Sequence, residues 1–303
     1  MKEAARPHCT CYRPGAGQPN HPDFARKIAA MAAIDELLPR PSVMGVVNVT
    51  PDSFSDGGAF LHPQAAIAEA RGMLEGGAAI IDVGGESTRP GSDGVSLEEE
   101  LRRVEPVLTA LSDAPVSIDT SKAAVARVAL EAGAEMVNDV TALRGDPELA
   151  SVIADSEACL CLMHMLGEPG TMQDDPRYDD VVSETKAFLD ERLEFATNAG
   201  IDEERICLDP GIGFGKTVEH NVELLARLDE IVALGRPVLI GASRKRFLGR
   251  LLGDQEALTG PVSAGVAVAV LAYERGATIF RVHDVREHVE ALTTARALEE
   301  VRS

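Results

Sequence analysis

From residue 43 onward, short apolar runs rich in valine and isoleucine alternate with longer stretches whose apolar residues recur every three or four positions. Short apolar runs predict buried β-strands, and the longer spacing predicts amphipathic helices. Eight strand-like runs occur, at 43–48, 79–84, 115–119, 135–139, 159–164, 205–209, 237–242 and 278–283. Helical stretches between them include residues 64–77, 96–111, 121–133 and 217–235. Several of these stretches begin with Ser or Thr and end with Gly, as helices often do.

Regular alternation of strand and helix predicts an α/β fold, and eight repeats predict a single (β/α)8 barrel of the TIM type over residues 43–303. An open, doubly wound parallel sheet is the alternative architecture for the same pattern. Residues 1–42 are different, because they are rich in Pro and Gly before a helical segment that follows Asp23. We interpret residues 1–42 as an N-terminal extension, partly flexible with a short helix, and residues 43–303 as the barrel domain.

Charge and cysteine content limit the classes of partner. Lys and Arg number 29 against 49 Asp and Glu, and the net charge of −20 predicts that the chain repels nucleic acid and anionic membranes. Five cysteines, three of them in apolar runs, do not make a disulfide framework, so we expect a reducing, cytoplasmic compartment. The longest apolar stretch, which begins at Val262, is shorter than the roughly 20 residues that cross a bilayer.

Nearly every predicted strand ends in Asn, Asp, His, Ser or Arg. The carboxyl ends of barrel strands form the active site of such folds, so these polar side chains are expected to converge. Asp119, Asn138 and Asp209 supply two carboxylates and an amide from three strands, which suit the N–H edge of a flat heterocycle such as guanine or a pterin. The two carboxylates would also suit a hard metal ion, and the sequence pattern leaves that alternative open.

A basic cluster is predicted at the end of the barrel sequence. Arg281 and His283 are two positions apart on the last strand, so their side chains point to the same side. Together with Arg244 and Lys245 of the preceding loop, they form the local cationic cluster that so acidic a chain needs for a phosphate group. A solvated basic helix start is the alternative reading, but basic residues there oppose the helix dipole.

Two loops are notable for their composition. The segment PGIGFGKT resembles a nucleotide-binding P-loop, but Pro210 stands where that motif requires glycine, so we reject a P-loop. Phe214 and Lys216 of this segment are predicted to be the wall and the rim of a pocket. The segment IIDVGGESTRPGS carries a stiff polar tip at residues 88–90.

Eight motifs in order closely resemble the dihydropteroate synthase family of the folate pathway, from about Val43 to the C-terminus. They are MGVVNVTPDSFSDGG, IIDVGGESTRPG, SIDTSK, NDV, CLMHM, LDPGIGFGK, GASRKRF and FRVHDV. Related folate-binding methyltransferases share the barrel and the Asp/Asn set. They would not be expected to carry the SRK and RVHDV pair, which here suggests a diphosphate.

The resemblance implies condensation of 6-hydroxymethyl-7,8-dihydropterin diphosphate with p-aminobenzoate, giving 7,8-dihydropteroate and diphosphate. It also implies a Mg²⁺ cofactor, inhibition by sulfonamides and a homodimer. A barrel that only binds a pterin or a folate is the second hypothesis. The intact basic cluster favours the synthase, because a mere binding protein has no use for diphosphate ligands.

The family motifs also imply a role for individual residues. The pterin would be bound by Asp119, Asn138, Asp209 and Lys245. The diphosphate would be bound by Asn48, Arg281 and His283, with Asn48 acting through Mg²⁺. The p-aminobenzoate pocket would be lined by Phe54, Thr88, Arg89, Pro90, Phe214 and Ser243. The catalytic groups would be Asp56, Lys245, Arg281 and His283, with the Asp56 carboxylate stabilising a cation-like transition state.

Overall fold

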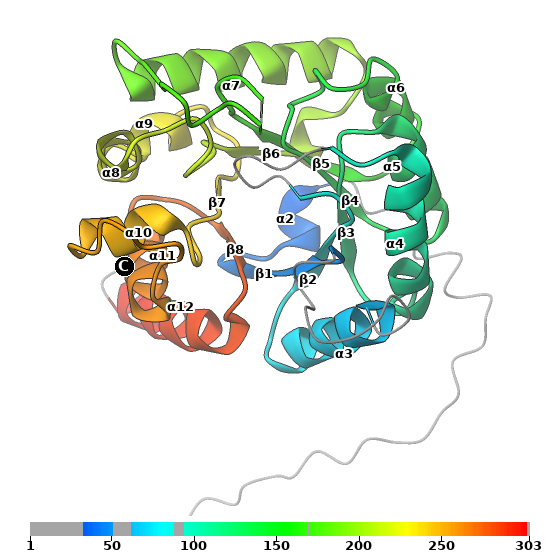
Figure 1. Cartoon of the computed structure of the whole chain (residues 1–303), viewed down its shortest axis with the longest axis horizontal. Coiled ribbons are helices and arrows are strands. Elements are labelled where there is room, and N and C mark those ends of the chain that lie inside the picture. Colours follow the sequence, from blue (N-terminus) through cyan, green and yellow to red (C-terminus); the bar gives the residue numbers. More distant parts are fainter. Residues whose placement is uncertain (1–32, 51–61, 88–93, 169, 302–303) are drawn as a thin grey trace, which may run out of the picture. The chain divides into compact units, whose positions relative to one another are not determined.

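The barrel predicted from the sequence is present in the computed structural model, which describes residues 33–50, 62–87, 94–168 and 170–301 (Figure 1). Its eight parallel strands are β1 (Ser42–Asn48), β2 (Ile80–Gly84), β3 (Val116–Asp119), β4 (Met136–Asp139), β5 (Cys159–Met163), β6 (Ile206–Asp209), β7 (Leu239–Ile240) and β8 (Ile279–Val282). They pair in the order β6-β5-β4-β3-β2-β1-β8-β7. A bridge between Leu208 and Val238 brings β6 to β7 and nearly closes the ring, so the open-sheet alternative is excluded.

Helices surround the strands, as the alternating pattern requires. They are α2 (Ile34–Leu37), α3 (His62–Glu75), α4 (Leu97–Ala110), α5 (Ala123–Glu131), α6 (Leu149–Ala154), α7 (Val181–Asn198), α8 (Val218–Ala226), α9 (Asp229–Val232), α10 (Arg246–Leu251), α11 (Val262–Glu274) and α12 (Val285–Glu300). Ser96 caps α4 and Thr217 caps α8 through their side chains, which confirms two predicted helix starts. No helix in the described ranges is long and apolar enough to cross a membrane.

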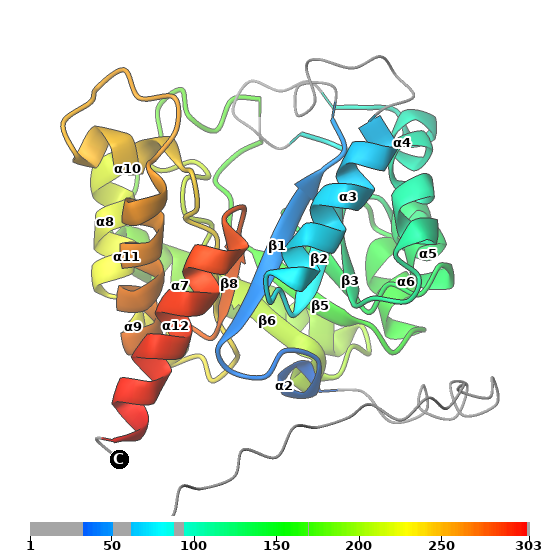
Figure 2. The ribbon, with the colours of Figure 1, turned by 90° about the horizontal axis from the view of Figure 1, so that it is seen from below.

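Alternate residues of each strand face the barrel interior, and the interior is apolar at the amino ends of the strands. We call this apolar set the floor: Met44, Ile80, Met136, Cys159, Cys161, Cys207, Leu239 and Ile279. Ile34 and Leu38 pack into the floor, so α2 covers that end of the barrel (Figure 2). Two positions beyond a floor residue, on the same side of four strands, stand Asp82, Asn138, Asp209 and Arg281. The barrel interior therefore changes from apolar to polar within one strand pleat.

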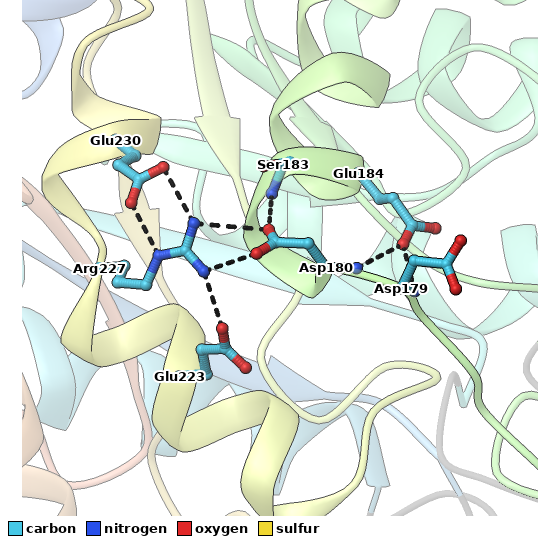
Figure 3. A network of polar contacts seen from close by, with 7 residues as sticks. All are labelled: Asp179, Asp180, Ser183, Glu184, Glu223, Arg227 and Glu230. Atoms are coloured by element: carbon cyan, nitrogen blue, oxygen red, sulfur yellow. Dashed lines mark hydrogen bonds and ion pairs between the residues drawn. The ribbon is translucent and has the colours of Figure 1, made fainter.

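The stretch predicted as one helix at 217–235 is divided into α8 and α9, and Arg227 lies between them. Its guanidinium bonds Asp180, the N-cap of α7, and also Glu223 and Glu230, at 2.7–2.8 Å (Figure 3). The Arg227 side chain is about one-third exposed, so water and salt screen these ion pairs. The network joins the start of α7 to α8 and α9 at the surface.

Replacing Arg227 by Met is expected to lower the melting temperature slightly at pH 7 and low salt. Hydrogen bonds from Arg227 and from Ser183 hold the pKa of Asp180 well below its usual range, so their stabilisation is present above about pH 4 and is lost on acidification. The difference from the parent protein should shrink in 1 M salt and below about pH 4. Arg177→Met removes an exposed ion partner of Asp175 and is the control. A difference unaffected by salt would contradict the electrostatic explanation.

Candidate active site

A cavity of about 720 Å³ lies at the carboxyl ends of the strands. The predicted site residues that line it are Asn48, Phe214, Ser243, Lys245, Arg281 and His283. Asp119, Asn138 and Asp209, which we call the strand-end triad, are buried at the ends of β3, β4 and β6. The other predicted site residues, Phe54, Asp56, Thr88, Arg89 and Pro90, lie outside the described residues.

Arg281 connects the cavity with the strand-end triad. Its Nη2 donates to Asp119 Oδ2 at 2.7 Å, and its Nε donates to Asp82 Oδ2 at 2.6 Å. The same oxygen of Asp82 accepts a hydrogen bond from Asn138 Nδ2 at 3.0 Å. Sequence reasoning assigns Asp82 no role in the site. An ionisable residue in the middle of an otherwise apolar strand is the signal that would have identified it.

Burial changes the protonation behaviour of these groups. Burial, with a smaller contribution from neighbouring carboxylates including Asp82, raises the pKa of Asp119 to about 7 against the lowering effect of Arg281. Burial also raises the pKa of Asp209. Burial alone would lower the pKa of Arg281, but Asp82 and Asp119 raise it, so the guanidinium stays charged. We call Asp82, Asp119, Asp209 and Arg281 the buried centre. It contains three carboxyl groups and one guanidinium.

Asp119→Asn is expected to make protein stability less dependent on pH. The pKa of Asp119 is raised in the folded state to about 7 from about 3.9 in the unfolded chain, so the folded form binds the proton more tightly. Its contribution to stability is complete below about pH 4 and is lost as the pH rises to about 7. The melting temperature should fall less between pH 5 and pH 8 in the variant than in the parent.

The control is Asp113→Asn, because Asp113 is exposed and Arg71 holds its pKa below the usual value. Removal of this carboxylate should not reduce the fall in melting temperature between pH 5 and pH 8. If the melting temperature of the Asp119→Asn protein falls as steeply between pH 5 and pH 8 as that of the parent, Asp119 does not titrate in this range.

His283 is less basic than the sequence prediction of a cationic cluster assumes. Burial, with Arg281 and Arg244 nearby, lowers the pKa of His283 to about 3, so its imidazole is neutral at pH 7. Its Nδ1 lies 3.3 Å from Ser243 Oγ, and its backbone N–H donates to the same oxygen at 3.2 Å. His283 thus offers a neutral hydrogen-bonding group instead of a charge.

Arg244 holds the loop after β7 against the loop after β8. Its guanidinium forms two hydrogen bonds with Asp284, at 2.6 and 3.1 Å. Its φ of 58° is in the left-handed region, which costs energy for a residue with a Cβ. The charge of Arg244 is thus paired with Asp284. The residues on either side of Arg244, Ser243 and Lys245, both line the cavity.

The loop that follows β6 forms one wall of the cavity. Lys245 Nζ lies 4.0 Å from the centre of the Phe214 ring, a cation–π contact. Lys216 lines the cavity as predicted, but it is only 3% exposed, so it lies inside the cavity and not at the predicted rim. Its Nζ bonds His164 Nδ1 at 2.8 Å and donates to the Phe214 carbonyl at 3.0 Å. Burial lowers the pKa of Lys216 to about 7. The bonds from Lys216 to His164 and to the Phe214 carbonyl hold this wall in place.

The chain resembles well-described proteins over most of its length. Residues 44–283 match the family described as "Pterin binding enzyme". The dihydropteroate synthase of Escherichia coli strain K12 is 47% identical over 265 residues, which cover 86% of this chain and 92% of that protein.

Two solved structures are similar in both fold and sequence. The Xanthomonas albilineans dihydropteroate synthase with 4-aminobenzoic acid superimposes with a TM-score of 0.79 at 49% identity, covering 86% of this chain and 94% of that one. The Yersinia pestis dihydropteroate synthase in complex with a sulfonamide drug superimposes with a TM-score of 0.80 at 45% identity. The match covers 86% of this chain and 95% of that one. With the barrel and the strand-end triad, these matches show that the chain belongs to the dihydropteroate synthase family of pterin-binding enzymes.

Proposed function

We propose that this protein condenses 6-hydroxymethyl-7,8-dihydropterin diphosphate with p-aminobenzoate to give 7,8-dihydropteroate and diphosphate. The observation that carries the proposal is the direct bond between Arg281, at the cavity, and Asp119 of the strand-end triad. This contact brings a cation suited to an anionic leaving group next to acceptors suited to the N–H edge of a pterin. Family membership supports the same reaction.

In the proposed reaction the C–O bond to diphosphate breaks and a C–N bond to the aromatic amine forms. The electron-rich pterin favours a loose transition state with positive charge on the methylene carbon. The strand-end triad and Lys245 hold the pterin, while Arg281 and the neutral His283 donate hydrogen bonds to the departing diphosphate. We assign stabilisation of the positive carbon to the Asp56 carboxylate. The amine attacks as the neutral species, and the positively charged nitrogen that forms then gives its proton to water.

The proposed p-aminobenzoate pocket combines Phe214 and Ser243 with residues that lie outside the described part. Phe214 supplies an aromatic surface for the substrate ring. Phe54, Thr88, Arg89 and Pro90 are proposed for the same pocket on the family motifs.

Mg²⁺ is the proposed cofactor, and Asn48 is its proposed protein ligand. The amide oxygen of Asn48 at the cavity is a hard donor of the kind that Mg²⁺ accepts. Within the described ranges no group of three or more His, Cys, Asp or Glu side chains could hold a metal. The residues thus fit an ion held jointly by Asn48, water and the substrate phosphates, where it would neutralise charge on the leaving group.

The decisive experiment is incubation of the purified protein with the pterin diphosphate, p-aminobenzoate and Mg²⁺, followed by detection of 7,8-dihydropteroate and diphosphate. Product formation that requires both substrates is expected. Tight binding of the pterin without product would support the alternative of a pure binding protein.

Sulfonamides are expected to inhibit competitively with p-aminobenzoate, because both present an aniline ring and an acidic group. Phe214→Ala removes the aromatic wall and should raise the KM for p-aminobenzoate and the inhibition constant together, by about tenfold. Leu258→Ala is the control, because Leu258 is at the outer edge of the cavity and is 84% exposed. A change in only one constant would show that the two molecules do not share the Phe214 wall.

We also propose that the protein is a homodimer in the cytoplasm. Helix α11 carries an outward apolar face with Val266, Ala267, Val270 and Leu271, of which Leu271 is 49% exposed. A second copy would cover such a face. Sedimentation analysis should give a dimer, and Leu271→Glu should shift it toward the monomer. The three described cysteines are free and buried, which supports a reducing compartment.

A further inference from the structure

We propose that Asp82 is a positioning residue for pterin recognition and leaving-group binding, acting through Asn138 and Arg281. The inference rests on the proposed function, since it gives Asp82 a part in the same site. Asp82 lies on β2, is fully buried and is not among the residues that line the cavity. Its effect on ligands is therefore exerted through the two side chains that it bonds.

The first side chain is Asn138. An ionised carboxylate only accepts hydrogen bonds, so the amide nitrogen of Asn138 must face Asp82, at 3.0 Å. This contact leaves the Asn138 Oδ1 atom as the group for a ligand. Asp119 and Asp209 also present acceptors when ionised. With Asp82 in place and both carboxyl groups ionised, the strand-end triad therefore offers acceptors only, the complement of the adjacent N–H donors on a pterin.

The second side chain is Arg281. Its Nε is bound to Asp82 and its Nη2 to Asp119, so the guanidinium is held from both sides. A pterin that bonds to Asp119 shares this carboxylate with Nη2 or competes with it, whereas the bond from Nε to Asp82 is outside that competition. Asp82 thus keeps Arg281 at the inner end of the cavity when the terminal nitrogens of the Arg281 guanidinium bind the diphosphate.

The neighbouring Ser117 provides a matched control. Ser117 on β3 pairs in register with Asp82, and it is fully buried as well. Its Oγ has no hydrogen-bond partner among the described residues. Ser117→Ala therefore changes the same layer of the barrel without removing a contact to Asn138 or Arg281.

Three variants test the proposal: Asp82→Leu, Asp82→Asn and Ser117→Ala. Calorimetry with 6-hydroxymethyl-7,8-dihydropterin measures binding through the strand-end triad without turnover. Asp82→Leu should raise the Kd by about 10–100-fold, because Asn138 and Arg281 lose their common acceptor. Asp82→Asn keeps an amide oxygen for both donors and should stay within about fivefold of the parent. Ser117→Ala should bind as the parent does.

Steady-state kinetics separate positioning from a general structural defect. At saturating pterin diphosphate, Asp82→Leu should lower kcat while the KM for p-aminobenzoate stays within about twofold, because neither bonded side chain belongs to that pocket. Parent-like pterin binding and kcat in Asp82→Leu would overturn the proposal. An equal loss in Ser117→Ala, or a comparable change in the KM for p-aminobenzoate, would also overturn it.

A measurement on the unmodified protein covers the case in which Asp82→Leu does not fold. The side-chain amide protons of Asn138, observed with selective ¹⁵N labelling, should exchange slowly with water both without and with the pterin. Loss of this protection on pterin binding would show that the bond to Asp82 breaks in the complex, against the proposal. Failure of the parent protein to form dihydropteroate would refute the proposed function instead, and the calorimetric comparison does not depend on turnover.

Discussion

Replacing Arg281 by Ala is expected to lower kcat by on the order of a hundredfold or more. Arg281 is the cation that links the cavity to the buried centre, with bonds of 2.6 and 2.7 Å to Asp82 and Asp119. In the variant the diphosphate loses the guanidinium at the inner end of the cavity that is proposed to bind it. Two carboxylates also remain buried without their shared partner, so stability should fall as the pH rises.

The measurements are steady-state turnover and calorimetric titration with diphosphate. Arg281→Lys retains the charge but not the fork that reaches both carboxylates, so an intermediate rate is expected. Arg296→Ala removes an exposed ion pair with Glu300 and should leave both measurements unchanged. Turnover near that of the parent in Arg281→Ala would remove the role assigned to this residue.

Asp209→Asn is expected to weaken pterin binding by about 1–3 kcal/mol while the fold is retained. Asp209 Oδ1 accepts a hydrogen bond from the Gly211 N–H at 2.7 Å. An asparagine keeps that bond through its own oxygen and presents an NH2 group in place of the second carboxylate oxygen. A donor then faces the N–H edge of the pterin, and two buried polar groups are mismatched.

Calorimetry with the pterin alcohol checks this result, and the KM for p-aminobenzoate at saturating pterin diphosphate should change little. Asp202→Asn provides a control for the amide substitution, because Asp202 is exposed before β6. Unchanged pterin affinity in Asp209→Asn would show that the heterocycle does not bind at the strand-end triad.

Much of the fold could be predicted because both periodicities are local. The eight apolar runs agree with the eight strands to within one or two residues at most ends, and Ser96 and Thr217 mark two helix starts correctly. The division at Arg227 was missed, and one of its ion partners, Asp180 at the start of α7, is far away in the sequence. A strand pattern and a cap are properties of neighbouring residues, whereas an ion pair between distant elements is not.

The site was predictable only in part for the same reason. The strand-end positions of Asp119, Asn138 and Asp209 follow from the barrel architecture. The pairing of Arg281 with Asp82 depends on which interior positions of β2 and β8 are level with each other, and no local pattern contains that information. The neutrality of His283 similarly depends on burial among residues from several loops.

The apolar floor and the polar layer one pleat above it are under different evolutionary constraints. A substitution in the floor leaves a cavity or a clash in a closed interior, so selection acts on it through stability. A substitution at the positions of Asp82, Asn138, Asp209 or Arg281 changes which hydrogen-bond donors and acceptors a ligand meets, while the floor that supports them is unchanged. A descendant lineage can thus acquire a different heterocyclic ligand through a few changes in one layer and keep the apolar floor that it inherited.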